Sequence, residues 1–219
     1  MKIIETKVYT FDELNDAAKE VAREWWRRGQ DGDNSFSEYV IEDAETCGEF
    51  IGIEIDKRAV KLCGGGTSQS PAVFFSGFSS QGDGACFEGS WRASDVKPGK
   101  LQEHAPQDKE LHRIAGEFER LAMEFPQASF TVKHSGRYSH KYCTDFTVDI
   151  TGDNEVALNE CGETAANQAE KDLIEAARDF MQWIYDSLEK EWTWQNADEQ
   201  VDDNIRANEY TFTEDGRQF

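Results

Sequence analysis

The chain has 219 residues and carries 44 acidic against 23 basic side chains, a formal net charge of −21. This charge repels nucleic acid and anionic lipid, and it attracts basic surfaces, including those that ordinarily bind nucleic acid. Apolar residues make up 38% of the chain and aromatic residues 12%, which excludes a disordered acidic chain and provides for a sizeable core.

No apolar run approaches the ~20 residues that span a bilayer, and the first residues lack the apolar stretch of a signal peptide. The five cysteines form no CxxC pair, so reduced thiols are expected rather than a disulfide framework. These features predict a cytoplasmic protein without membrane contact.

The first half of the chain is expected to mix strands and helices. Residues 3–10 alternate as a strand does, and Thr10 with Glu13 matches a capping box that opens a helix ending near Arg28. A second helix is expected over residues 36–48. Three strands should follow, at residues 51–56, 72–78 and 86–92.

The second half is dominated by two helices of clear apolar periodicity. The elements expected in chain order are a polar loop at 94–107, a helix at 108–125 that Pro126 ends, paired strands at 128–134 and 142–150, a helix at 164–191, and a short strand at 210–213. The last long helix has two apolar stripes about 100° apart, which indicates a central, well-covered position.

Because strands outnumber helices and do not alternate with them one for one, the predicted class is α+β. We expect a mainly antiparallel sheet with helices packed on one face, in a single domain with a long C-terminal helix. The other face of such a sheet can meet water. The expected division is an α+β domain at residues 1–192 and an acidic C-terminal extension at 193–219, packed on that domain or flanking it.

A glycine-rich segment, residues 75–89, is the first candidate for chemistry. Ser80-Gln81-Gly82-Asp83-Gly84 lies between two apolar runs and is typical of a hairpin turn, in which glycines supply positive φ. A ligand held by backbone amides or by Asp83 is the alternative. Neither a phosphate-loop motif nor a serine nucleophile elbow is present.

The second candidate is the segment from His134 to Cys143, the densest group of nucleophilic and acid–base side chains in the chain. His134 and His140 would flank one hairpin end and could share a metal with Cys143 or Asp145. Their spacing matches no zinc motif, so a polar, partly aromatic turn is the competing interpretation. No metal ligand, cofactor or catalytic residue is assigned from the sequence.

Acidity itself is the third candidate. Five acids follow one line of the long helix, interrupted by Gln182: Asp172, Glu175, Asp179, Asp186 and Glu189. Such a line is either a solvated face that maintains solubility or an array that imitates a nucleic-acid backbone, since acids three or four residues apart on a helix lie ~5–6 Å apart. The open sheet face could add a second acidic patch: Glu54, Asp56, Glu88, Asp145 and Asp149.

Residues 7–26 (KVYTFDELNDAAKEVAREWW), 75–89 (FSGFSSQGDGACFEG) and 131–146 (TVKHSGRYSHKYCTDF) together resemble a group of phage and prophage proteins often labelled as antitoxins of toxin–antitoxin systems. The resemblance covers residues 1–150 and leaves out the strongly acidic C-terminal part. It implies a phage gene product that acts on a host protein in the host cytoplasm, and it carries over no site residue.

These observations lead to three hypotheses. The first is an acidic, non-enzymatic inhibitor that occupies the basic surface of a host defence complex of the CRISPR or restriction type, without binding nucleic acid directly. Its partner-binding residues would be the five helix acids with Glu88, Asp145 and Asp149. The second is an antitoxin-like neutraliser of a basic toxin. The third is a small metal-dependent enzyme that uses His134, His140 and Asp83. The oligomeric state stays open, a dimer included.

Overall fold

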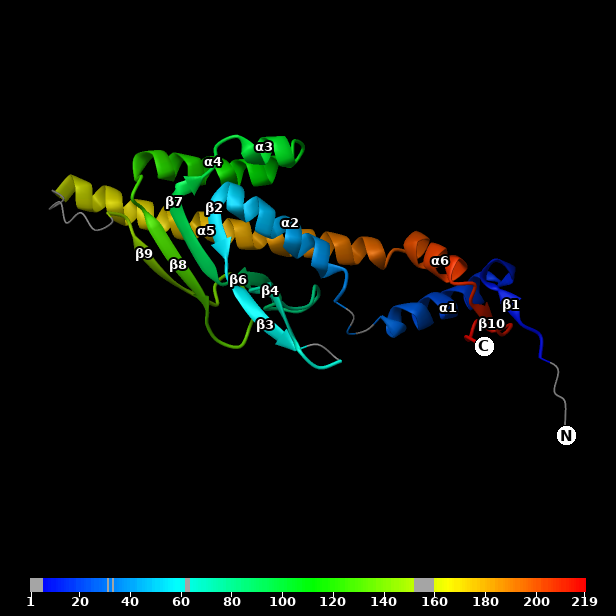
Figure 1. Ribbon diagram of the computed structural model, residues 1–219. Helices are drawn as coiled ribbons and strands as arrows, with labels where there is room; N and C mark the ends of the chain where they lie inside the picture. The colour runs from blue at the N-terminus through cyan, green and yellow to red at the C-terminus, as the bar shows by residue number, and fades with distance from the viewer. Residues whose placement is uncertain (1–5, 31, 33, 62–63, 152–159) are drawn as a thin grey trace. The chain divides into compact units, whose positions relative to one another are not determined.

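Two compact units make up the chain in the computed structural model, one of residues 39–188 and the other of residues 1–38 with 189–219. The structure describes residues 6–30, 32, 34–61, 64–151 and 160–219, with side chains from residue 163 onward in the last range. Figure 1 gives the element labels. The predicted α+β class is confirmed, with antiparallel sheets and a long C-terminal helix.

The larger unit is built on a four-stranded antiparallel sheet in the order β2-β7-β8-β9. Its strands are β2 (Ile51–Ile55), β7 (Gly89–Val96), β8 (Ser129–His134) and β9 (Thr144–Asp149). Alternate residues of each strand point to opposite faces, so the buried Phe130 and Val132 alternate with the exposed Thr131 and Lys133 on β8. One face of the sheet is therefore covered, as predicted, and the other is open.

Helices cover the apolar face of this sheet (Figure 1). They are α2 (Ser37–Phe50), α3 (Lys100–His104), α4 (Lys109–Glu124) and α5 (Glu160–Gln195). Trp91 of β7 contacts Phe118 of α4 and stacks on Phe130, and Phe180 of α5 contacts Phe87. Nine residues of α5 are buried among those whose side chains are described, which confirms its central position: Ala169, Leu173, Ala176, Ala177, Phe180, Met181, Trp183, Ile184 and Leu188.

Two short hairpins complete this unit, and they differ from the prediction. The hairpin of β3 (Lys57–Lys61) and β4 (Thr67–Pro71) was not expected, because its exposed residues have no apolar alternation. The strand expected at 72–78 is the shorter β5 (Val73–Phe75), paired with β6 (Ala85–Phe87).

The strand predicted over residues 86–92 is divided, because Glu88 lies between β6 and β7 and β7 begins at Gly89. The backbone of β2 passes so close that a Cβ at this position would overlap the carbonyl oxygen of Glu54. Glycine is thus required for the pairing of β2 with β7, which positions the open face of the sheet.

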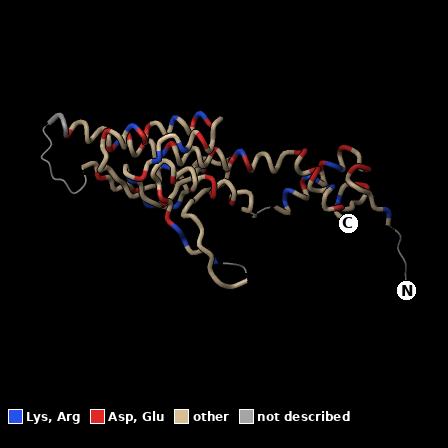
Figure 2. Tube along the Cα trace, turned by 45° about the horizontal axis from the view of Figure 1, so that its top comes forward, with Lys and Arg blue, Asp and Glu red and all other residues tan. Residues whose placement is uncertain are grey.

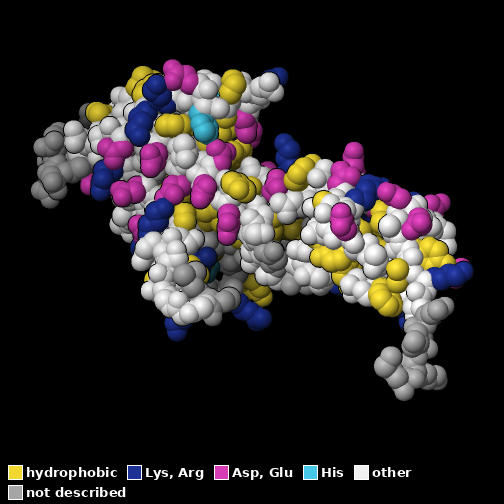
Figure 3. Space-filling view, turned by 45° about the vertical axis from the view of Figure 1, so that its right-hand side comes forward, with side chains coloured by type: hydrophobic (Ala, Val, Ile, Leu, Met, Phe, Trp, Pro, Cys, Tyr) yellow, Lys and Arg dark blue, Asp and Glu magenta, His cyan; other side chains and the backbone are white. Residues whose placement is uncertain are grey.

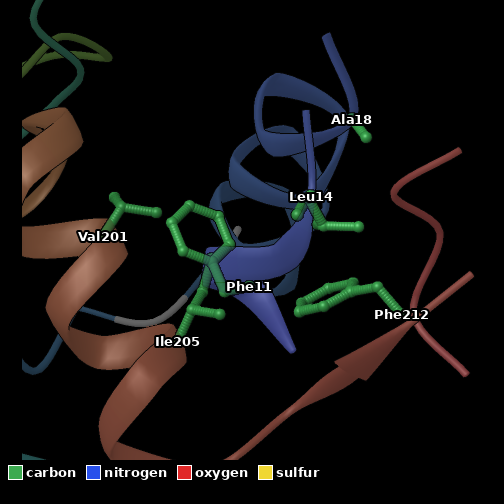
Figure 4. Packing of buried hydrophobic residues seen from close by; sticks show 7 residues of the cluster. Phe11, Leu14, Ala18, Val201, Ile205 and Phe212 are labelled. Atoms are coloured by element: carbon green, nitrogen blue, oxygen red, sulfur yellow. The ribbon is translucent and has the colours of Figure 1, made fainter. Parts of the chain in front are cut away.

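The smaller unit joins both ends of the chain. It contains β1 (Tyr9–Thr10), the 3₁₀ helix η1 (Phe11–Glu13), α1 (Asp16–Gly29), α6 (Asp198–Ala207) and β10 (Thr211–Phe212), with β1 paired to β10. Its buried core is Phe11, Leu14, Ala18, Ala22, Val201, Ile205 and Phe212, and Figure 4 shows the rings of Phe11 and Phe212 among the aliphatic side chains.

This unit corrects two expectations about the ends of the chain. Residues 193–219 are not an extension of a 1–192 domain, because Val201, Ile205 and Phe212 complete a core with residues 1–38. The capping box of Thr10 and Glu13 is confirmed, but it caps η1, and α1 begins after Asn15, whose side chain accepts a hydrogen bond from the Ala18 amide. Of the strand expected at 3–10, only Tyr9–Thr10 is a strand among the described residues.

Candidate functional site

The predicted acidic line of α5 lies beside arginines of α4. Arg113 binds Asp179 at 2.6 Å and Arg120 binds Asp172 at 3.0 Å. The two pairs are seven residues apart on both antiparallel helices, so they repeat after two helical turns. The heptad spacing of Asp172 and Asp179 therefore has a structural role. It places both acids beside arginines of α4, and the two ion pairs form a salt-bridge seam between α4 and α5.

Acids remain in excess along this seam. Arg113 also binds Glu110, and Arg120 also binds Glu117 and Glu124, so each arginine is shared by carboxylates of both helices. We name the whole set the acidic ridge: Glu110, Glu117, Glu124, Asp172, Glu175, Asp179 and Asp186. Figure 3 shows acidic side chains intermixed with a few basic ones over the larger unit.

The other predicted acids of α5 have weaker partners. Glu175 lies 3.9 Å from Arg178, and Asp186 accepts a hydrogen bond from the side chain of Gln182 at 2.8 Å. Both are exposed. Glu189 belongs to the smaller unit, so it is counted apart from the ridge. Of the five acids predicted to bind a partner on the long helix, Asp172 and Asp179 thus form close ion pairs with arginines of α4, whereas Glu175 and Asp186 do not.

The open sheet face carries acids, as expected, but also bases. Asp145 lies opposite Lys133 in the β8–β9 register, and Asp149 lies in one row with Ser129 and Arg92. Glu54 is exposed on β2. Oppositely charged neighbours reduce the net field of this face, so it is a weaker acidic array than the ridge.

Lys133 also binds the two remaining predicted acids of this group. Its Nζ lies 2.6 Å from Asp56 and 3.5 Å from Glu88, and the hydrogen bond to Asp56 raises the pKa of Lys133. Glu88 is half-buried and also accepts the His134 amide at 3.3 Å. Glu88 therefore joins β6 to β8 and is less available to a partner than an exposed acid.

The two segments singled out for chemistry meet in space. The turn between β5 and β6 lies against the loop between β8 and β9: a Cβ on Gly84 would be 3.1 Å from the His140 ring, and one on Gly82 would be 3.8 Å from Tyr138. Within the turn, Asp83 accepts hydrogen bonds from the Ser79 and Ser80 amides. This use of Asp83 favours the hairpin-turn interpretation of the segment.

Both histidines of this loop have local partners. The Nε2 atom of His134 lies 3.1 Å from the Tyr138 carbonyl oxygen, and its ring stacks on Phe74. The Nδ1 atom of His140 accepts the Tyr142 amide at 3.2 Å, and its ring stacks on Tyr142. These contacts describe an aromatic loop end rather than a pair of free acid–base groups.

The basic residues near the β5–β6 turn and the β8–β9 loop were not recognised as a group from the sequence. Residues 57–82 and 127–144 hold six of the 23 basic residues and none of the 44 acids. Figure 2 shows basic residues along β3 as its hairpin leaves the sheet. The signal was present as two acid-free stretches in a strongly acidic chain, but only the structure brings them together through Phe74 and His134.

A separate group of potential metal ligands lies at α2 and α3. The ligand atoms of Asp43, Cys47 and His104 all lie within 4.8 Å of one another, and these residue types suit zinc. Among the described residues, His134 and His140 belong to no such group. The Nε2 atom of His104 already shares a hydrogen bond of 2.7 Å with Asp43.

Burial should protect two cysteines from alkylation. It raises the pKa of Cys47 and of Cys86 to about 12, with nearby Asp43 adding to the shift at Cys47. A thiol with a raised pKa stays neutral and contributes stability below its unfolded pKa of ~8.5, and that contribution is lost as pH rises toward 12. At pH 8.5 we expect iodoacetamide to leave both thiols unmodified in the folded chain and to modify both in denaturant, by peptide mass spectrometry.

The half-buried Cys143 provides the internal comparison for this experiment. Modification of Cys47 or Cys86 in the folded chain at the rate seen in denaturant would contradict the enclosed positions of the two thiols.

Comparison with known proteins gives a family but no activity. A family model described as a domain of unknown function, DUF8835, matches residues 36–198, which is more than half of the chain. No curated protein matches the chain. No solved structure matches it either. None of the helices in the described part of the chain has the length and apolar character that crossing a bilayer requires. The chain belongs to the DUF8835 family.

Proposed function

We propose that this protein is an inhibitor that binds a basic, nucleic-acid-handling surface of a host defence complex through its acidic ridge. The observation that carries the proposal is the excess of carboxylates on α4 and α5, where five acids share two arginines, Arg113 and Arg120, and two further ridge acids, Glu175 and Asp186, are exposed. Acids on neighbouring helical turns present negative charge at intervals comparable to those of a nucleic-acid backbone.

The seam also fixes this charge in place. Arg113 and Arg120 hold Asp179 and Asp172 on a helix whose opposite face is buried in the core. A rigid array loses little conformational entropy on binding, which favours recognition by a preformed basic groove. Electrostatic attraction between such surfaces speeds association and weakens as salt rises.

The resemblance to phage proteins supports a defence complex in the host cytoplasm as the class of partner. Phage products meet CRISPR and restriction complexes there, and both bind nucleic acid through basic grooves. An antitoxin would instead bind a basic toxin, and the same ridge could serve it.

Binding should depend on the five ridge acids other than Asp172 and Asp179, the two that join α5 to the arginines of α4. The variant E110Q/E117Q/E124Q/E175Q/D186N is expected to associate about tenfold or more slowly with its complex at low salt, because steering depends on local charge. The measurement is surface plasmon resonance against a panel of purified CRISPR and restriction complexes, from 50 to 500 mM salt, with DNA or RNA as competitor.

A matched control separates the ridge from net charge. The variant E38Q/E42Q/E49Q/E199Q/E214Q makes the same change in charge at other exposed acids and should slow association far less. The variant R113Q/R120Q leaves the ridge more acidic and should associate faster. Equal effects of the two five-residue variants would contradict the ridge, and binding only to a toxin would replace the inhibitor with an antitoxin.

A further inference from the structure

We propose that the loop end of the larger unit binds single-stranded nucleic acid. The surface consists of cations and aromatic rings from β3, β5, the β8–β9 loop and α5: Arg58, Lys61, Phe74, His134, Arg137, Tyr138, His140, Lys141, Tyr142 and Arg178. We name it the basic aromatic end. Figure 1 shows the β3–β4 hairpin and the β8–β9 loop at the same end of the sheet.

Direct contacts make the first half of this surface continuous. The Arg58 guanidinium lies 4.8 Å from the centre of the Phe74 ring, which stacks on His134 at 4.7 Å. The ring of His134 in turn contacts the Tyr138 carbonyl, and Arg137 lies 5.8 Å from the Tyr138 ring. Cations and rings thus alternate from the β3 hairpin to the β8–β9 loop.

The second half extends the same pattern to α5. His140 stacks on Tyr142 at 5.2 Å, and Lys141 lies 5.6 Å from the Tyr142 ring. Arg178 lies 5.0 Å from that ring, and its buried Nε atom has no hydrogen-bond acceptor among the described residues. A buried donor normally has a partner, so the Arg178 guanidinium has a hydrogen-bond donor that the described residues leave unused.

Four of these cations have no acidic partner in the described part of the chain. Arg58, Lys61, Arg137 and Lys141 form none of the ion pairs there, whereas Lys57 and Lys133 bind Glu45 and Asp56. In a chain with almost two acids for each base, unpaired cations gathered at one end are not a consequence of composition. They remain available to an anionic ligand.

The mixture of groups fits nucleic acid better than an acidic protein. Phosphates bind Arg and Lys, while unstacked bases lie on aromatic rings and on guanidinium planes. Tyr138 and Tyr142 are 56% and 59% exposed, so large parts of both rings meet solvent. Carboxylates of a protein partner would use the cations but not the rings. A single strand is favoured because its bases are free to leave the stack.

Charge segregation reconciles this proposal with the net charge of −21, from which no direct nucleic-acid binding was expected. Fields are screened over ~8 Å at physiological salt, so a ligand responds mainly to the charges near it. The proposal does not depend on the acidic ridge, since it concerns other residues and another class of ligand.

The test is fluorescence anisotropy with labelled 20-nucleotide oligo-dT and oligo-rU and the full chain, from 25 to 200 mM salt. We expect binding that weakens with salt. The variant R58Q/K61Q/R137Q/K141Q should lower affinity about tenfold or more at 50 mM salt and reduce the log–log salt slope by up to ~2.8, or ~0.7 for each phosphate that is no longer neutralised. The variant Y138A/Y142A should lower affinity about tenfold or more while leaving the salt slope nearly unchanged.

Matched controls make the result specific. The variant K7Q/K109Q/K171Q/K190Q removes the same charge from exposed lysines elsewhere and should leave affinity within twofold of the native chain. Circular dichroism checks that all variants fold. The proposal is overturned by the absence of binding at 25 mM salt, by an equal loss in the control variant, or by polyglutamate binding as tightly as oligo-dT, which would indicate an acidic protein partner.

Discussion

Replacing Trp91 with alanine is expected to lower the free energy of unfolding by about 3–5 kcal/mol, the usual cost of deleting a buried aromatic side chain. Trp91 is fully buried at the centre of the sheet, stacks on Phe130 and contacts Phe118. Its indole N–H also donates a hydrogen bond to the Ile51 carbonyl oxygen at 2.8 Å, across the β2–β7 pair. The loss would be measured by urea denaturation followed by circular dichroism.

Two further variants divide this effect into its parts. Trp91→Phe keeps a ring but leaves the Ile51 carbonyl without its donor, so we expect a loss of about 1–3 kcal/mol. Trp194→Ala removes an indole that is 54% exposed and should change stability by less than about 0.5 kcal/mol. A Trp91→Ala variant as stable as Trp194→Ala would contradict the core described for the larger unit.

The second large effect is expected at the other end of the chain, where Phe212→Ala should destabilise the smaller unit by about 3–5 kcal/mol. Phe212 is fully buried, and its ring contacts Phe11 and Trp25. Loss of this ring leaves a cavity between the N-terminal helices and the C-terminal strand (Figure 4). Hydrogen-exchange mass spectrometry should show faster exchange in residues 1–38 and 189–219.

Phe219 provides the control, because it is the same residue type in the same segment but is 63% exposed. Phe219→Ala should leave exchange in both segments unchanged. Unchanged exchange in Phe212→Ala would contradict the assignment of residues 193–219 to a core with residues 1–38.

Most elements could be predicted from the sequence where apolar periodicity was strong. The helix expected at 108–125 is α4, ended at Pro126, and the strands expected at 128–134 and 142–150 are β8 and β9. Asp108 caps α4 through the Leu111 amide and also accepts the Trp183 indole N–H at 2.8 Å. The residues around Asp108 indicate the helix cap, whereas nothing in the sequence indicates the contact of Asp108 with Trp183 of α5.

Elements whose residues lack such periodicity were missed. The β3–β4 hairpin is polar and exposed on both faces, and α3 lies within the polar segment expected to be a loop. In α6, only Val201 and Ile205 are buried in an acid-rich sequence, so the helix depends on packing against Phe11 and its neighbours. Tertiary contacts decide such segments, because their own propensity does not.

The sequence by itself determined the α+β class, the strong acidity and the heptad line of acids on the long helix, because composition and periodicity are local properties of the chain. Only the tertiary structure decided which charges stay free. Arg113 and Arg120 neutralise part of the acidic line, while Arg58, Lys61, Arg137 and Lys141 come together at one loop end without acidic partners among the described residues. Such pairing depends on side chains far apart in sequence, and these are brought together when the sheet and α5 pack into one core.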